Sequence, residues 1–117
     1  FVKPGTFVAA VGADSPDKQE LESSILVGDN VKVVPDILEQ CVKAGELHHA
    51  IEKGLMSEKD VYGQLGEIIA GKIKGRTSDE EIFVYDATGT AIQDTTAAAL
   101  CYEKAVKNKI GSKIKFF

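Results

Sequence analysis

The stretch 7–21, FVAAVGADSPDKQEL, changes within a few residues from an apolar run to a polar segment marked by proline. Five apolar residues without alternation, 7–11, predict a β-strand that is covered on both faces, as in a parallel sheet. Gly12 ends this strand. Ser15 and Pro16 then predict a helix start, because serine is a good N-cap and proline suits the first helical position. Asp14 therefore lies just past the carboxyl end of a strand.

Asp14 stands where open α/β sheets bind their ligands, in the crevice outside the carboxyl ends of the strands. An acid at this position can hold or move a proton on a ligand. It can equally be a turn residue that bonds nearby backbone. The residues around it leave both interpretations open.

The rest of the chain alternates apolar runs with helical patterns. We expect further strands at 31–34 and 82–85 and helices at 18–26, 36–45, 57–71 and 92–108. Asp36 with Glu39, and Ser57 with Asp60, have the spacing of capping boxes. The order predicts an α/β fold: a partial doubly wound, Rossmann-like parallel sheet of about three strands with flanking helices.

The dinucleotide-binding fingerprint G-x-G-x-x-G is absent from this sequence. Its nearest candidate, Gly63 with Gly66, falls inside a predicted helix, whereas the fingerprint follows a strand. We therefore expect that the first nucleotide-binding βαβ unit does not lie in this chain.

Both histidines of the chain, His48 and His49, lie in the segment 46–54. His48 and Glu52 have i, i+4 spacing and can share a helix face, whereas the two histidines are expected to point apart. With no further cluster of ligand residues visible, we expect no metal site.

Composition describes one small globular domain: 117 residues, of which 44% are hydrophobic and 27% charged. The net charge of −4 argues against a nucleic-acid-binding surface, and the lysines near the C-terminus fit a solvated helix end. No apolar run is long enough for a membrane span. The two cysteines, Cys41 and Cys101, are far apart, which suits reduced thiols in a cytoplasmic protein.

Four blocks of the sequence resemble the ornithine cyclodeaminase/μ-crystallin family, in the same order and at similar spacing. These are VKPGT (2–6), AVGADSPDKQEL (10–21), GEIIAG (66–71) and DATGTAIQD (86–94). Several ordered blocks are far more specific than a single glycine motif. The resemblance implies that the chain corresponds to the C-terminal third or so of such a protein, and that it is a cut piece starting in the middle of a domain.

The resemblance also assigns site residues. Asp14 matches the catalytic acid, placed to handle a substrate proton near a nicotinamide ring, and μ-crystallin-like relatives lack this acid. Thr88 matches a position that touches the substrate. Ala87 departs from the residue expected in a typical cyclodeaminase, which leaves the substrate open. The matched cofactor-binding positions are Val11, Gly12, Ala13, Lys18 and Ala87.

The function implied is oxidation or reduction of an amino or imino acid with NAD or NADP, as in ornithine cyclodeaminase, alanine dehydrogenase or ketimine reductase. Residues 1–90 would form the C-terminal half of a Rossmann-like cofactor domain. Residues 91–117 would form a helix that returns toward a substrate or dimerisation domain of a homodimer. The alternatives are a non-catalytic, crystallin-like binding protein and a fragment that is inactive alone. The strand at 7–11 is expected to pair with another chain.

Overall fold

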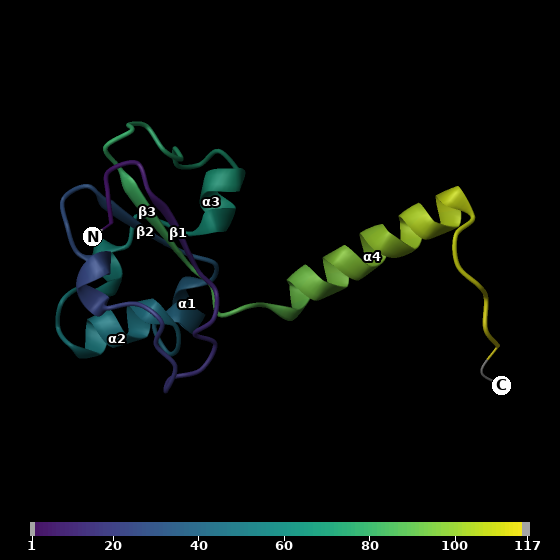
Figure 1. Ribbon diagram of the computed structural model, residues 1–117, viewed down its shortest axis with the longest axis horizontal. Helices are drawn as coiled ribbons and strands as arrows, with labels where there is room; N and C mark the ends of the chain where they lie inside the picture. Colours follow the sequence, from purple (N-terminus) through teal and green to yellow (C-terminus); the bar gives the residue numbers. More distant parts are fainter. Residues whose placement is uncertain (1, 116–117) are drawn as a thin grey trace.

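The computed structural model describes residues 2–115 and contains one parallel β-sheet (Figure 1). Its strands are β1 (Phe7–Ala10), β2 (Val31–Pro35) and β3 (Ile82–Asp86), in the order β1-β3-β2. Within the described residues β3 is central, since its Val84 pairs with Val8 on one side and Val33 on the other. The predicted α/β class with three parallel strands is confirmed.

Strand β1 is an edge strand of this sheet, and its predicted burial on both faces is wrong. Phe7 is 62% exposed, and among the four residues only Ala10 is buried. The strand also ends one residue early, because Val11 already lies outside the ladder with β3. An edge strand with one uncovered face still reads as a continuous apolar run, so the sequence could not separate the two cases.

The core lies on one face of the sheet, where α2 (Glu46–Glu52) and the 3-10 helix η1 (Ser23–Leu26) pack. Leu26 and Ala50 of these helices meet Val33 and Val84 of the strands. The short helix α3 (Leu65–Ile69) lies over the opposite face, beside Phe83 and Tyr85. The sheet is therefore covered on both sides near β2 and β3, in the manner of a doubly wound fold.

Three of the predicted helices are shorter than expected, and the helix at 36–45 is reduced to residues 38–41. The helix at 18–26 is reduced to η1, and Ser15 and Pro16 begin no helix, because side chains elsewhere bind the backbone between them and η1. The helix at 57–71 is split into the 3-10 helix η2 (Glu58–Asp60) and α3. The capping box of Ser57 with Asp60 is confirmed, on η2.

In helix α1 (Leu38–Cys41) the N-cap position is Ile37, and no side chain makes a cap hydrogen bond there. The predicted capping box of Asp36 with Glu39 is therefore wrong. The carboxylate of Asp36 instead accepts the N–H of Ile37 at 2.6 Å and that of Gly89 at 3.1 Å. Asp36 thereby ties the end of β2 to the turn that follows β3.

Helix α4 (Ala91–Asn108), predicted at 92–108, extends away from the sheet and its helices (Figure 1). In the described chain none of its residues is buried, and Ile92 and Tyr102 are 72% and 70% exposed. No helix within residues 2–115 combines the length and the apolar character needed to cross a membrane.

Candidate functional site at the carboxyl edge of the sheet

The carboxyl ends of β1 and β3 open onto a cavity of about 310 Å³. Asp14, from the loop after β1, and Thr88, from the turn after β3, both line it. Helix α1 and the residues after it supply the opposite wall. The complete lining is Asp14, Gln40, Lys43, Ala44, Thr88 and Gly89. The structure thus brings together the predicted catalytic and substrate residues, which are far apart in sequence; we name this space the Asp14–Thr88 cavity.

Asp14 forms an ion pair with Lys18, with 2.5 Å between Oδ1 and Nζ. Both side chains are about half exposed, at 56% and 53%. The hydrogen bond and the charge of Lys18 lower the pKa of Asp14, and Asp14 in turn raises the pKa of Lys18. At neutral pH Asp14 is therefore a carboxylate, and the ion pair with Lys18 stabilises this ionised form.

Thr88 and Lys43 give the cavity polar groups of another kind. The Thr88 hydroxyl donates to Oε1 of Gln40 at 3.1 Å, which fixes its position against the wall. The Lys43 ammonium is exposed and lies 3.0 Å from Oε1 of Glu39. A hydroxyl and an ammonium near a carboxylate suit a zwitterionic ligand, which carries both a carboxylate and an ammonium group.

The predicted cofactor positions divide into two groups. The side chain of Val11 is 62% exposed, and Gly12 and Lys18 are also exposed. Ala13 and Ala87 are only 1% and 7% exposed, and the N–H of Ala87 donates to the carbonyl oxygen of Ala10 at 2.9 Å. Val11, Gly12 and Lys18 are therefore accessible to a ligand, whereas the side chains of Ala13 and Ala87 are buried.

None of these predicted cofactor positions lines the Asp14–Thr88 cavity itself. Val11 presents an apolar surface at the strand end, next to the backbone of Gly12 and close in sequence to Asp14. A volume of about 310 Å³ is near the lower limit for ligand pockets, which suits a small acid. The pyrophosphate would need a glycine-rich loop between strand and helix, and this sequence lacks that fingerprint.

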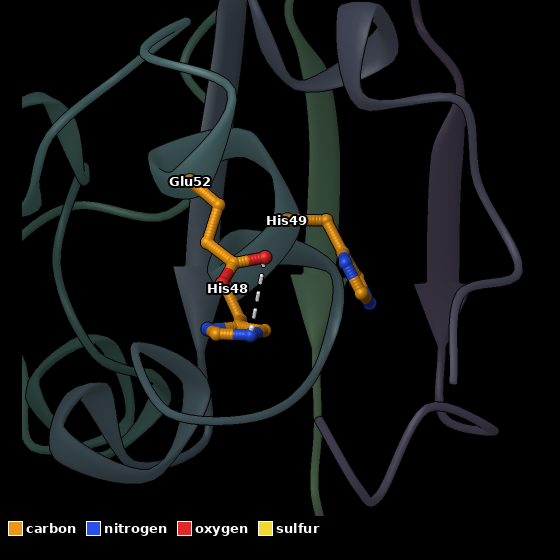
Figure 2. Close-up of side chains that lie close together, drawn as sticks. All are labelled: His48, His49 and Glu52. Atoms are coloured by element: carbon orange, nitrogen blue, oxygen red, sulfur yellow. Dashed lines mark ion pairs between the residues drawn. The ribbon is translucent and has the colours of Figure 1, made fainter. Parts of the chain in front are cut away.

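Three side chains on α2, His48, His49 and Glu52, gather more closely than the sequence suggested (Figure 2). One potential ligand atom of each lies within 4.8 Å of the others, and the two rings meet edge to face at 5.2 Å. The expectation that the histidines point apart is therefore wrong. Each ring also binds a carbonyl oxygen: Nδ1 of His48 that of Val42 at 3.0 Å, and Nε2 of His49 that of Lys18 at 2.7 Å. Because a carbonyl only accepts, these two nitrogens carry the protons.

Two buried acids near the cavity were missed by the sequence analysis. Asp86 is fully buried and Glu46 is 1% exposed. Burial raises the pKa of Asp86 from its ordinary 3.8 to about 6, although the N–H groups of Leu47 and Glu46 act in the opposite direction. An acid that ends an apolar strand run, as in IFVYD at 82–86, was a usable signal for Asp86, whereas Glu46 follows Gly45 with nothing to distinguish it.

Comparison with known proteins places the whole chain within one family of sequences. The profile described as "Ornithine cyclodeaminase/mu-crystallin family" matches residues 1–109. The alanine dehydrogenase of Archaeoglobus fulgidus is 49% identical over 117 residues, which are 100% of this chain and 36% of that protein.

Solved structures agree with this comparison. An archaeal alanine dehydrogenase dimer with bound NAD superposes with a TM-score of 0.83 at 49% identity, covering 99% of this chain and 36% of that one. The Δ(1)-pyrroline-2-carboxylate reductase of Thermococcus litoralis, in complex with NADH and L-proline, gives a TM-score of 0.83 at 30% identity, covering 97% and 35%. The chain thus spans about a third of the length of these proteins.

Proposed function

Because the chain belongs to the ornithine cyclodeaminase/mu-crystallin family, we propose that it forms part of an NAD(P)-dependent site that oxidises an amino acid or reduces an imino acid. The observation that carries this proposal is the Asp14–Thr88 cavity, where an ionised acid and a hydroxyl from two strand ends share one small space. Ligand binding at the carboxyl edge of a parallel sheet is the general rule for such folds.

In this proposal Asp14 handles the proton on the substrate nitrogen. Asp14 is a carboxylate at neutral pH, and in this proposal it takes a proton from the α-ammonium group as the carbon–nitrogen double bond forms. A nicotinamide held there would supply the hydride acceptor for the α-carbon, or the hydride donor in the reverse direction. Lys43 is the lining cation for the substrate carboxylate, and Thr88, whose hydroxyl proton goes to Gln40, contacts the substrate with its oxygen as an acceptor. Val11 and Gly12 would face the nicotinamide, and Lys18 would contact the cofactor.

The same proposal extends to the rest of the chain. Residues 1–90 form the second half of a Rossmann-like cofactor domain, and 91–117 reach toward a substrate or dimerisation domain. The exposed apolar side chains of α4 support this, because four large ones, Ile92, Leu100, Tyr102 and Val106, have no cover within the described chain. The open edge of β1 would be paired in the same assembly, which we propose is a homodimer.

The test is the substitution Asp14→Asn in the natural polypeptide, with Asp17→Asn as the matched control. Asp17 is an exposed acid of the same loop that accepts the hydroxyl of Ser15. We expect kcat to fall roughly 100-fold or more in Asp14→Asn, with nucleotide affinity unchanged, because one proton-transfer group is lost. The control keeps its kcat. Equal loss in both variants would contradict the role of Asp14, and nucleotide binding without turnover in the wild type would favour the crystallin-like alternative.

A further inference from the structure

The loop that carries Asp14, residues 12–21, is held by a carboxylate that comes from α2. Glu46 accepts the backbone N–H of Glu20 on Oε1 at 2.7 Å and that of Leu21 on Oε2 at 3.1 Å. The Glu46 side of these bonds is buried, at 1% exposure, and hydrogen bonds to a charged acceptor are strong. We name residues 12–21 the Asp14 loop.

Two more contacts complete the attachment of the Asp14 loop. Oε2 of Glu20 accepts the N–H of Gly12 at 2.9 Å and closes the loop at its base. Nε2 of His49 donates to the carbonyl oxygen of Lys18 at 2.7 Å, so α2 holds the loop at a second point (Figure 2 shows the His49 side chain). The residue that pairs with Asp14 is thus itself fixed through its backbone.

Helix α2 is in turn fixed to the strand that leads to Thr88. The buried carboxylate of Asp86, at the end of β3, accepts the N–H groups of Glu46 at 3.2 Å and Leu47 at 2.8 Å. Gly45 permits this approach, because a Cβ there would lie 2.9 Å from Oδ1 of Asp86. Helix α2 is therefore bound to both sides of the Asp14–Thr88 cavity. It is bound to the Asp14 loop through Glu46 and to the end of β3 through Asp86.

We infer that Glu46 is a positioning residue, whose carboxylate holds the Asp14 loop so that Asp14 faces Thr88 across the cavity. This inference rests on the proposed function for its catalytic consequence. Glu46 does not line the cavity and acts on the reaction only through Asp14. A carboxylate is required because it offers two acceptor oxygens to two N–H groups. An amide of the same shape offers one acceptor and turns its own N–H₂ group toward the second donor.

The test compares Glu46→Gln with Glu52→Gln, an exposed glutamate of the same helix. In this chain we expect amide hydrogen exchange at Glu20 and Leu21 to rise about tenfold or more in Glu46→Gln, while Val84 in β3 keeps its protection. In the natural polypeptide we expect kcat to fall roughly 10- to 100-fold, with the affinity for NAD(P) within about twofold of wild type. The control changes neither quantity.

A second variant guards against loss of folding. Glu20→Gln alters an exposed side chain whose carboxylate closes the Asp14 loop at its base. We expect it to loosen the Asp14 loop as Glu46→Gln does, but by a smaller amount. In both variants the pKa of Asp14, measured by NMR titration, should rise toward its ordinary value, because a looser loop weakens the contact with Lys18.

The outcomes separate the inference from the proposed function. Faster exchange spread evenly over β3, or unchanged exchange and an unchanged Asp14 titration in Glu46→Gln, would overturn the inference. A wild-type polypeptide that binds no nucleotide would instead overturn the proposed function. The exchange and titration measurements would still decide whether Glu46 holds the loop.

Discussion

The buried carboxyl of Asp86 should make the stability of this chain depend on pH in an unusual direction. Its folded-state pKa is about 6 against an ordinary 3.8, mainly because burial penalises the charged form. Below about pH 4 the group is protonated whether the chain is folded or unfolded. Between pH 4 and 6 the folded state keeps a proton that the unfolded state releases, so the free energy of unfolding falls as the pH rises.

The magnitude follows from the size of this shift. The difference between 3.8 and about 6 is roughly 2 pKa units, and each unit corresponds to about 1.4 kcal/mol. The contribution of Asp86 is fully present below pH 4, and about 3 kcal/mol of it is lost above pH 6. Exposed acids with a lowered pKa, such as Asp14 and Glu39, have the opposite effect: they make the free energy of unfolding rise as the pH rises.

Asp86→Asn removes the titrating group, and the difference between wild type and variant cancels the contribution of the other acids. We expect this difference in the free energy of unfolding to change by about 2 kcal/mol between pH 4 and 7, because the unfolded carboxyl is already partly ionised at pH 4; the measurement is urea denaturation followed by circular dichroism. Asp29→Asn, at an exposed acid, is the control and should show no such change. A difference that is constant with pH would refute the assignment of a desolvated carboxyl at Asp86.

Further predictions address the turn, the ion pair and the last helix. Gly45→Ala should destabilise the chain by about 2 kcal/mol in urea, since its φ is +92°. Gly66→Ala, in α3 with open space around it, should be neutral or stabilise by roughly 0.5–1 kcal/mol; equal effects of the two would contradict the argument. Lys18→Met should raise the pKa of Asp14 in an NMR titration, and an unchanged pKa would show that the ion pair does not persist. Val106→Asp, on exposed α4, should weaken self-association in sedimentation experiments while leaving the urea midpoint unchanged; a lowered midpoint would show that α4 packs on the sheet.

Sequence patterns within one segment were enough to predict the elements that are determined by residues of that same segment. The three strands and α4 lie within one or two residues of their predicted positions. The helix predicted at 18–26 fails because Glu46 takes the N–H groups of Glu20 and Leu21, which are 26 and 25 residues away. A capping signal at Ser15 cannot compete with a buried carboxylate that the sequence places on another element.

The candidate site shows the same division. Asp14 and Thr88 were identified through the resemblance of their segments to a family, and the structure places both on one cavity. The partners of Asp86 and Glu46 lie 40 and 26 residues away, so the sequence does not show what these acids bind, although the position of Asp86 at the end of an apolar run marks it as unusual. The burial of Ala87, which was expected to touch the cofactor, follows from the bond of its N–H to β1.

We propose that the carboxyl edge of this sheet takes part in hydride chemistry on an amino or imino acid. Rapid mixing of the natural polypeptide, NAD(P) and a panel of amino acids, followed by nicotinamide absorbance, tests it most directly. We predict formation of reduced nicotinamide, lasting for a dehydrogenase and transient for a cyclodeaminase, at a rate roughly 100-fold or more slower in Asp14→Asn. Bound nucleotide with no absorbance change for any amino or imino acid, in either direction, would contradict the account.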